Sequence, residues 1–332
     1  MRGTKIANQK FAFASGLYDR FLPLYTKQVE PEGLDLDFTV IDDPRQIFDR
    51  MAAGLEFDAC EMSGTEYITH LATGNSPFVA LPVFASRMFR HGFIVINTRS
   101  GIKTPKDLEG RRVGVQLYTM SAAMWIRGML QHDHGVDLST ISWVQGSIDS
   151  PGTHGTPTVL PLLKQPDVVN NDTDRSLSQL LEDGEIDAVL TATLPTGLGT
   201  HPDLARLFPN FRQVETDYYT RTKIFPIMHF VVIRKDVYNR NPAAAGALYD
   251  AFCRAKEIAL ERLRYSGALR YMLPFLPDDV DEIDRVFDGD PWPYGIEANR
   301  PTLEAEIQYM VEQDYIAGPM AIEDLFVPGV GY

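Results

Sequence analysis

The sequence predicts a two-lobed α/β protein in which each lobe is a mixed sheet flanked by helices and a cleft lies between the lobes. The 332 residues fit about two domains of roughly 100–200 residues each. Short apolar segments alternate with helix-like segments through the first third of the chain, which is typical of parallel strands covered by helices. Apolar runs on both sides of the polar segment 85–92 indicate a crossing from one lobe to the other.

Short apolar runs bounded by polar or turn residues predict the strands of the first lobe, at residues 10–14, 34–41 and 57–60. Apolar residues at helical spacing predict helices at residues 44–53 and 65–73, and later at 243–265 and 303–313. Alternation of this kind implies that the first strands are parallel.

Two crossings between the lobes are expected, near residues 85–92 and again near residues 223–233. Lobe I then comprises residues 1–95 and 225–332, and lobe II comprises residues 96–224. Residues 151–171 are rich in Pro, Gly, Thr and Asn and predict a long surface excursion of lobe II, a kind of loop that is more often functional or mobile than inert.

Two segments of the second lobe resemble the recurring strand entries of type II solute-binding proteins. The first, residues 101–115, contains Asp-Leu-Glu-Gly-Arg-Arg-Val-Gly-Val, and the second, residues 176–190, contains Leu-Glu-Asp-Gly-Glu-Ile-Asp-Ala. Each predicts a helix or turn that ends at a glycine and leads into a buried strand. The resemblance implies a type II periplasmic-binding-protein-like fold but says little about activity.

The composition excludes several partners. A formal net charge of −14 and a pI near 4.9 argue against a nucleic-acid or anionic-membrane surface. No apolar run reaches the roughly 18 residues of a membrane span, and no signal-like run follows the charged N-terminus, so we expect a soluble, cytoplasmic protein. Cys60 and Cys253 are too far apart for a metal motif and are expected to be reduced. A homo-oligomer is possible, since Trp292 and Tyr294 could cover a subunit interface or close the cleft, although packing within a lobe is the favoured expectation for such aromatic residues.

Ligands in open α/β sheets bind beyond the carboxyl ends of strands, at helix N-termini. Three segments are expected there, and they supply the candidate substrate-binding residues Tyr18, Arg20, Ser63, Tyr118, Thr119 and Ser121, with the candidate catalytic Glu61 between them. Thr119 and Ser121 could equally be simple caps of the helix expected at residues 119–131, because hydroxyl residues are preferred N-caps.

Arg87, Arg90 and His91 lie together at the first crossing. A guanidinium donates two parallel hydrogen bonds to a carboxylate, so both arginines are candidate substrate ligands; the alternative is pairing with surface carboxylates. His229, in an apolar run at the second crossing, is either a satisfied core residue or a proton-transfer group at the hinge.

A set of unusual polar clusters resembles the 4,5-dihydroxyphthalate decarboxylase family nearly from end to end. The matching text comprises Tyr18-Asp19-Arg20, Glu61-Met62-Ser63, Ser86-Arg87-Met88-Phe89-Arg90-His91, Phe225-Pro226-Ile227-Met228-His229, Trp292-Pro293-Tyr294-Gly295 with Asn299-Arg300, and Glu323-Asp324-Leu325-Phe326. The resemblance implies loss of CO2 from a hydroxylated aromatic acid, phthalate-like or hydroxybenzoate-like.

Two departures from the family pattern fall in the second lobe. Leu117 stands where relatives commonly carry a carboxylate beside a tyrosine, and Thr153-His154 follow Pro151-Gly152 where relatives commonly carry an arginine. Loss of that arginine predicts weaker recognition of one carboxylate.

Decarboxylation of a hydroxyarene without an electron sink requires a cationic clamp, a proton donor over the ring carbon that carries the carboxylate, and a partner for the phenol. We expect Arg20, Arg87 and Arg90 to form the clamp. Glu61 or His229 would transfer the proton, and His91 with Tyr118 would face the phenol. No cofactor is required for this chemistry.

Three alternatives remain open at the level of sequence. Glu61, His91 and His229 could hold a divalent metal ion that polarises a catechol oxygen. The chain could also be a non-catalytic solute-binding protein for an aromatic carboxylate, or a ligand sensor whose lobes close without turnover.

Overall fold

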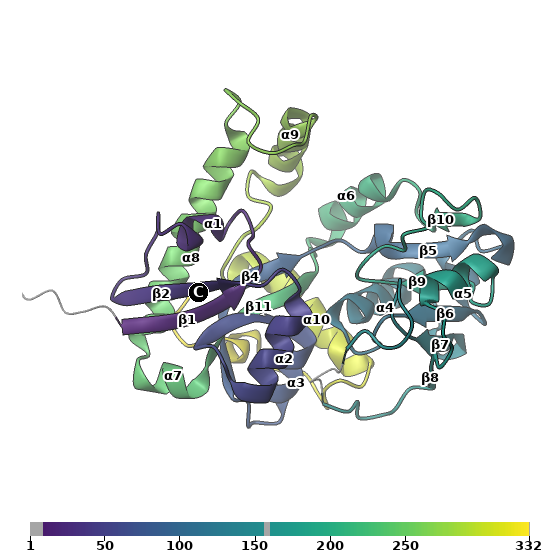
Figure 1. Ribbon diagram of the computed structural model, residues 1–332, viewed down its shortest axis with the longest axis horizontal. Helices are drawn as coiled ribbons and strands as arrows, with labels where there is room; N and C mark the ends of the chain where they lie inside the picture. Colours follow the sequence, from purple (N-terminus) through teal and green to yellow (C-terminus); the bar gives the residue numbers. More distant parts are fainter. Residues whose placement is uncertain (1–8, 156–159, 332) are drawn as a thin grey trace, which may run out of the picture.

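The computed structural model describes residues 9–155 and 160–331 and contains two sheets that lie side by side along the long axis of the molecule, each flanked by helices (Figure 1). Both sheets are mixed, as the sequence predicted. Helix α4 (Ser121–His134) of the second lobe packs against helix α10 (Arg300–Glu312) of the first, so the two lobes are in direct contact.

The first sheet has the order β2-β1-β3-β11-β4. Strand β1 is parallel to both of its neighbours, β2 and β3, whereas β11 is antiparallel to both of its neighbours, β3 and β4. The strands of this sheet are β1 (Gln9–Ser15), β2 (Leu34–Val40), β3 (Ala59–Ser63), β4 (Phe78–Arg87) and β11 (Ile227–Arg234). Strand β11 begins the second segment of lobe I and places His229 opposite Ser63 of β3. This pairing joins the two segments of lobe I in one sheet.

The helices of the first lobe are α1 (Leu22–Tyr25), α2 (Pro44–Gly54), α3 (Gly64–Ala72), α7 (Lys235–Arg240), α8 (Ala243–Arg264), α9 (Leu276–Phe287) and α10. Most of them bury apolar residues in the core of this lobe, whereas α9 has only Leu276 buried and packs beside α8, away from the sheet (Figure 1). The core around Phe11, Phe13 and Phe252 is fully buried. Trp292 donates its indole N–H to the Phe84 carbonyl at 2.7 Å and Tyr294 is 8 % exposed, so both pack within this lobe.

The second sheet has the order β10-β5-β9-β6-β7-β8. Its strands are β5 (Ile94–Asn97), β6 (Arg112–Val115), β7 (Ser142–Gln145), β8 (Val168–Asn170), β9 (Ala188–Leu190) and β10 (Leu204–Arg206), and its helices are α4, α5 (Leu177–Asp183) and α6 (Phe211–Thr222). Ser176 caps α5 through a capping box with Gln179, and Gly184 ends it at φ +79°, a left-handed conformation that suits glycine. The helix–glycine–strand motif is therefore confirmed.

Of the two roles left open for Thr119 and Ser121, capping of α4 is not the one the structure shows: the N-cap residue is Met120, without a side-chain cap, and the Ser121 hydroxyl is engaged with Thr65 instead. The segment 151–171, of which residues 156–159 lie outside the described residues, was expected to be a surface excursion, but its described part ends in β8 and its Leu162 is buried in the core of the first lobe.

Strand β5 straddles the expected lobe boundary at residue 95 and belongs to the second sheet. The chain returns to the first sheet at β11, two residues beyond the expected boundary at 225. Among residues 9–155 and 160–331, the structure contains no helix long and apolar enough to cross a membrane.

Candidate active site

Glu61 is the centre of a buried polar network at the carboxyl ends of β1 and β3. Its carboxylate is completely buried and accepts hydrogen bonds from Tyr18 Oη (2.6 Å), His229 Nδ1 (2.6 Å), Ser15 Oγ (2.8 Å) and Gly16 N (3.2 Å). Donors from two strands, β1 and β11, and from the turn after β1 thus converge on one side chain of β3.

These donors decide the charge of Glu61. Burial alone would raise the pKa of its carboxyl, but the hydrogen bonds from His229, Tyr18 and Ser15 outweigh burial and lower the pKa below the ordinary value. Burial and the neighbouring Glu61 raise the pKa of the Tyr18 phenol, so Tyr18 remains a donor. Glu61 is accordingly an anionic acceptor at neutral pH.

His229 connects this network to an open cavity. Its Nδ1 points at Glu61, its side chain is 18 % exposed, and its ring packs edge-on against Phe48 at 5.0 Å. Because an anionic Glu61 can only accept, Nδ1 carries a hydrogen and the remaining ring nitrogen, Nε2, is the one left to act on a ligand. This is the orientation that a proton-transfer histidine needs.

Three hydroxyls lie together at the N-terminus of α3. Ser63, Thr65 and Ser121 have their hydroxyl oxygens 3.1–3.2 Å apart, and the Thr65 backbone N–H donates to Ser121. Thr65 also donates to the Thr119 carbonyl at 3.0 Å, while the buried Thr119 hydroxyl has no partner among the described residues. Ser121 comes from lobe II, so this cluster joins the two lobes.

A cavity of about 260 Å³ lies between the lobes and in contact with both groups. Its lining residues are Asp43, Pro44, Arg45, Phe48, Ser63, Glu66, Arg90, Leu117, Met120, Ser121, Ala122, His154, Ala192, Thr193, Met228 and His229. Of the residues expected from the sequence, Ser63, Arg90, Ser121 and His229 line the cavity. Glu61 does not line it but is hydrogen-bonded to His229, and Tyr18 is hydrogen-bonded to Glu61.

Arg90 is a buried cation without a counter-ion in contact. It is 7 % exposed, Nη1 donates to the Ala192 carbonyl at 3.2 Å, and Nε has no hydrogen-bond partner among the described residues. No carboxylate in residues 9–155 or 160–331 forms an ion pair with it. Burial lowers its pKa to about 10, so it remains charged and a ligand anion would stabilise it.

The structure places Arg20 and Arg87 away from this cavity. The Arg20 guanidinium stacks on Trp292 and Tyr18, at 4.0 and 4.3 Å from the ring centroids, and donates to the Ala85 carbonyl. Arg87 donates to the Asn299 side chain inside lobe I, near a buried Glu306 whose pKa burial raises well above its ordinary value. Both arginines hold parts of lobe I together.

His91 and Tyr118 are also elsewhere. His91 lies between Phe208 and Tyr218, with ring centroids 5.5 and 5.1 Å away, and its Nδ1 is 3.8 Å from Glu215. Tyr118 packs on Arg127 and Trp143 and lines a different hollow. Neither faces the Glu61 network.

The expected metal ligands are therefore not assembled as a set of three. Glu61 and His229 are adjacent, but His91 is held in the aromatic contact described above. Within the part of the chain that the structure describes, no group of three His, Cys, Asp or Glu side chains is arranged to hold a metal ion.

The sequence did not nominate the other lining residues as site residues, and the polar or aromatic ones among them are Asp43, Arg45, Phe48, Glu66, His154 and Thr193. Arg45 lies in the first turn of α2, which follows β2 of the parallel sheet. The rule that ligands bind beyond the carboxyl ends of parallel strands could have found it. His154 appeared in the sequence only as a departure from the family pattern.

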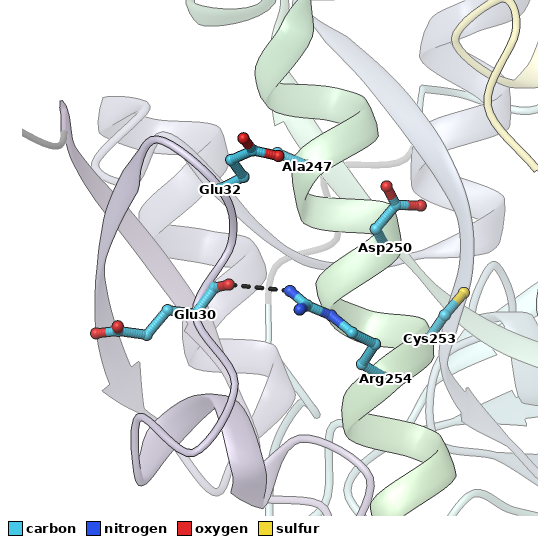
Figure 2. A pocket seen from close by; sticks show the side chains of 6 residues that line it. All are labelled: Glu30, Glu32, Ala247, Asp250, Cys253 and Arg254. Atoms are coloured by element: carbon cyan, nitrogen blue, oxygen red, sulfur yellow. Dashed lines mark hydrogen bonds between the residues drawn. The ribbon is translucent and has the colours of Figure 1, made fainter. Parts of the chain in front are cut away.

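A second hollow illustrates why volume alone does not locate the site. Figure 2 shows it between α8 and the loop before β2, lined by Glu30, Glu32, Ala247, Asp250, Cys253 and Arg254, with Arg254 donating to the Glu30 carbonyl at 3.0 Å. Three carboxylates make it unsuited to an anionic ligand.

Comparison with curated proteins decides the family. The chain is 37% identical over 296 residues to a 4,5-dihydroxyphthalate decarboxylase of Comamonas testosteroni, and the match covers 89% of each protein. The chain belongs to the 4,5-dihydroxyphthalate decarboxylase family. A Pseudomonas putida protein of the same name is 36% identical over 209 residues, covering 63% of the chain and 80% of that protein. Membership confirms the carboxy-lyase class that the sequence motifs indicated.

Two further comparisons concern the fold. Residues 31–152 match the family model described as NMT1/THI5 like. The aliphatic sulphonate-binding protein SsuA of Escherichia coli superposes with a TM-score of 0.52 at 13% identity, covering 97% of the chain and 98% of that protein. A sulfonate-binding SsuA of Methylobacillus flagellatus gives a TM-score of 0.51 at 13% identity, covering 97% and 93%. The periplasmic-binding-protein-like fold is thus confirmed.

Proposed function

We propose that this chain is a non-oxidative decarboxylase of a hydroxylated aromatic acid, phthalate-like or hydroxybenzoate-like, that acts by protonating the ring carbon bearing the carboxylate. The observation that carries the proposal is the Glu61–His229 pair at 2.6 Å, positioned on a cavity that also contains the unpaired Arg90. A proton donor and an anion site are the two parts that this reaction needs most.

Arg90 binds the substrate carboxylate. Its guanidinium is buried and free of a contacting carboxylate among the described residues, so an incoming anion gains a charge-assisted hydrogen bond without displacing an existing ion pair. The apolar side chains of Leu117, Met120 and Met228 line the same cavity and pack against the faces of the aromatic ring.

His229 donates the proton. In its imidazolium form Nε2–H protonates the ring carbon, forming a C–H bond there while electrons from a ring hydroxyl flow into the ring. The C–C bond to the carboxylate then breaks, its electron pair restores the aromatic ring, and CO2 leaves. Glu61 is a positioning residue, since it holds Nδ1–H and stabilises the imidazolium without contacting the substrate.

Ser63 and Ser121 face the ring hydroxyls. Their hydroxyl groups line the cavity and already share hydrogen bonds with Thr65, so they can accept from or donate to a phenol. In this proposal they take the role that the sequence suggested for His91 and Tyr118. Closure of the two lobes excludes water and strengthens each of these electrostatic interactions.

Replacement of the pair tests the mechanism. Glu61→Gln keeps the shape of the side chain and removes its charge, so we expect ligand binding to persist while kcat falls roughly 100-fold or more, the scale of a lost general acid. His229→Asn should lose turnover similarly, and the double variant should lose little more, because the two residues act as one unit. Release of CO2 and ultraviolet change with hydroxybenzoates and phthalates measure the rates.

Several results would contradict this mechanism. A Glu61→Gln enzyme with near wild-type kcat would exclude a role of the carboxylate in proton transfer. If this variant lost activity but kept the wild-type pH profile of kcat, the role of Glu61 would be structural only. Loss of a stoichiometric divalent ion from both variants, found by elemental analysis, would replace the acid–base mechanism by a metal-assisted one. Binding without CO2 release for every acid would favour the solute-binding or sensor function.

The expected cytoplasmic location and the expected homo-oligomer stay predictions. Cell fractionation tests the first and light scattering of the purified protein tests the second. Cys60 is buried and Cys253 half-buried, and both are free thiols, consistent with a reducing compartment.

A further inference from the structure

The C-terminal half of α8, the connection that follows it and α9 project from lobe I as an arm (Figure 1). The tip of this arm, residues 265–275, carries five apolar side chains that are between 51 % and 101 % exposed: Tyr265, Leu269, Met272, Leu273 and Phe275. In residues 9–155 and 160–331 together, eleven large hydrophobic side chains are exposed, so nearly half of them gather in this short segment. Such a concentration is typical of a surface that binds another macromolecule.

The same arm carries an apolar hollow toward its base. The hollow has a volume of about 370 Å³, and its apolar lining includes Leu260 and Leu263 of α8, Ile283 and Phe287 of α9, and Phe89 and Phe225. Phe89 lies between β4 and β5, Phe225 lies between α6 and β11, and their rings stack at 4.4 Å. The hollow therefore rests on both segments that connect the lobes.

The charged residues at the hollow are already paired. Arg20 forms an ion pair with Asp19 at 3.2 Å, and Lys256 forms one with Asp290. Each cation thus has a carboxylate partner within the chain. The hollow suits apolar side chains of a protein partner, because such pockets receive the central anchors of an interface.

Charges without an ion-pair partner in the described part of the chain lie at two places on the arm. Arg270 is at the tip, where its guanidinium stacks on the Tyr265 ring at 5.1 Å, and Asp278 and Asp281 are on α9. All three are exposed. The neighbouring Asp284 differs, since it pairs with Arg264 of the same chain.

These features are complementary when two arms lie side by side in opposite directions. The tip of each arm then meets the base of the other, so that apolar tip side chains face the hollow and Arg270 faces the acidic α9. A two-fold symmetric contact requires both complementary parts on one surface, and the arm has both. This self-complementarity favours a second copy of the chain over an unrelated protein.

We infer that the chain forms a two-fold symmetric homodimer through its α8–α9 arms, with Met272 and Phe275 of each copy in the hollow of the other. The inference goes beyond the proposed function and does not depend on it, because the arm contains none of the residues that line the interlobe cavity.

Sedimentation-velocity ultracentrifugation of the 332-residue chain over a range of concentrations tests the inference. We expect a dimer, and Phe275→Asp should raise its dissociation constant roughly 100-fold, the scale of an interface anchor lost from both copies. Val169→Asp is the matched control, because it places the same charge on a side chain that is 59 % exposed on β8 of lobe II. A wild-type chain that is monomeric at every concentration, or a dimer that both variants weaken equally, would overturn the inference.

A charge exchange tests the antiparallel arrangement. Arg270→Glu should raise the dissociation constant roughly fivefold or more at low salt, because it turns an exposed attraction into a repulsion. Adding Asp278→Arg and Asp281→Arg to this variant should restore the wild-type value. A triple variant as weak as Arg270→Glu alone would show that the tip of one copy does not face α9 of the other, and the inference would fail.

Hydrogen exchange tests the hollow as the receptor for the tip. In the dimer the tip of one copy covers Phe89 and Phe225 of the other, so their amides should exchange more slowly than in the Phe275→Asp monomer. Exchange at Val169, outside the arm, should be the same in both. Equal exchange at Phe89 and Phe225 in dimer and monomer would exclude the hollow and overturn the arrangement.

Discussion

Arg90 and Arg87 are three residues apart and contact different surroundings, so the same substitution should have different consequences. Arg90→Ala removes the free guanidinium of the cavity, and we expect the association constant for substrate and kcat/KM to fall at least tenfold. Arg87→Ala removes the partner of Asn299 inside lobe I. It should lower the free energy of unfolding by about 3 kcal/mol or more, the scale of a broken buried polar cluster.

Thermal unfolding and calorimetry of the two variants separate these effects. Weaker substrate binding by a folded Arg87→Ala protein with unchanged melting temperature would return Arg87 to the carboxylate clamp, as the sequence suggested. Unchanged kinetics in Arg90→Ala would remove Arg90 from it.

His91 makes the stability of the protein depend on pH. It is 2 % exposed, and burial with the charges of His134 and Arg221 lowers its pKa to about 3, from an ordinary value of 6.5. Below pH 6.5 the His91 imidazole therefore binds a proton in the unfolded chain but not in the folded protein. Its contribution to the free energy of unfolding is fully present above pH 6.5 and is lost as the pH decreases toward 3. At pH 5 the loss from this group is about 2 kcal/mol.

His91→Phe should abolish that part of the acid sensitivity, because Phe packs between Phe208 and Tyr218 without a proton to gain. Between pH 7.5 and pH 5 the free energy of unfolding of the wild type should therefore fall by about 2 kcal/mol more than that of the variant. Denaturant titrations at both pH values measure it. His201→Asn, a partly exposed histidine, is the control, and an equal shift in the control would refute the role of His91.

At the scale of elements, α4 joins the lobes through a close helix–helix contact. A Cβ on Gly128 would overlap the ring of Tyr309 on α10, and Trp125 of α4 donates to the Ile227 carbonyl of β11 at 2.8 Å. Gly128→Ala should therefore push α4 away from α10 and lower the free energy of unfolding by about 1–3 kcal/mol. Because α4 begins at Ser121 of the cavity, the association constant for substrate should fall as well.

Gly246→Ala provides the matched comparison. Gly246 lies within α8 with nothing within 4 Å of a Cβ added to it, so alanine should stabilise the helix by up to about 1 kcal/mol and leave substrate binding unchanged. Melting temperatures of the two variants that move in the same direction would contradict the close approach of α4 and α10.

Local sequence signals were sufficient for many of these elements. Helix α2 was expected at residues 44–53 and spans Pro44–Gly54, where Asp43 caps it and Pro44 fits the first turn. Helix α8 was expected at 243–265 and spans Ala243–Arg264. The cap of α4 was not predictable, because Ser121 is drawn into a hydrogen bond with Thr65, 56 positions earlier in the chain.

At the scale of the whole molecule, the site could be predicted only in part because it is assembled by the pairing of distant strands. Glu61 and His229 are 168 positions apart and meet only because β11 inserts between β3 and β4. Residue type at strand ends was enough to nominate both. It could not show that His91, from the same polar cluster as Arg90, turns toward Phe208 and Tyr218 instead of the cavity.

The cavity takes its lining from both lobes, so ligand binding should stabilise the protein across the interlobe contact. A ligand at 100 times its dissociation constant adds about 2.7 kcal/mol to the free energy of unfolding. With a hydroxybenzoate at that concentration we expect a higher melting temperature, and slower hydrogen exchange at Phe48 and His229 of lobe I as well as at Leu117 and Thr193 of lobe II. Arg90→Ala at the same ligand concentration is the control and should show neither effect. Protection confined to one lobe would mean that the ligand binds outside the interlobe cavity, since a molecule clamped between Arg90, His229 and the Ser63–Ser121 pair must restrain both sides at once.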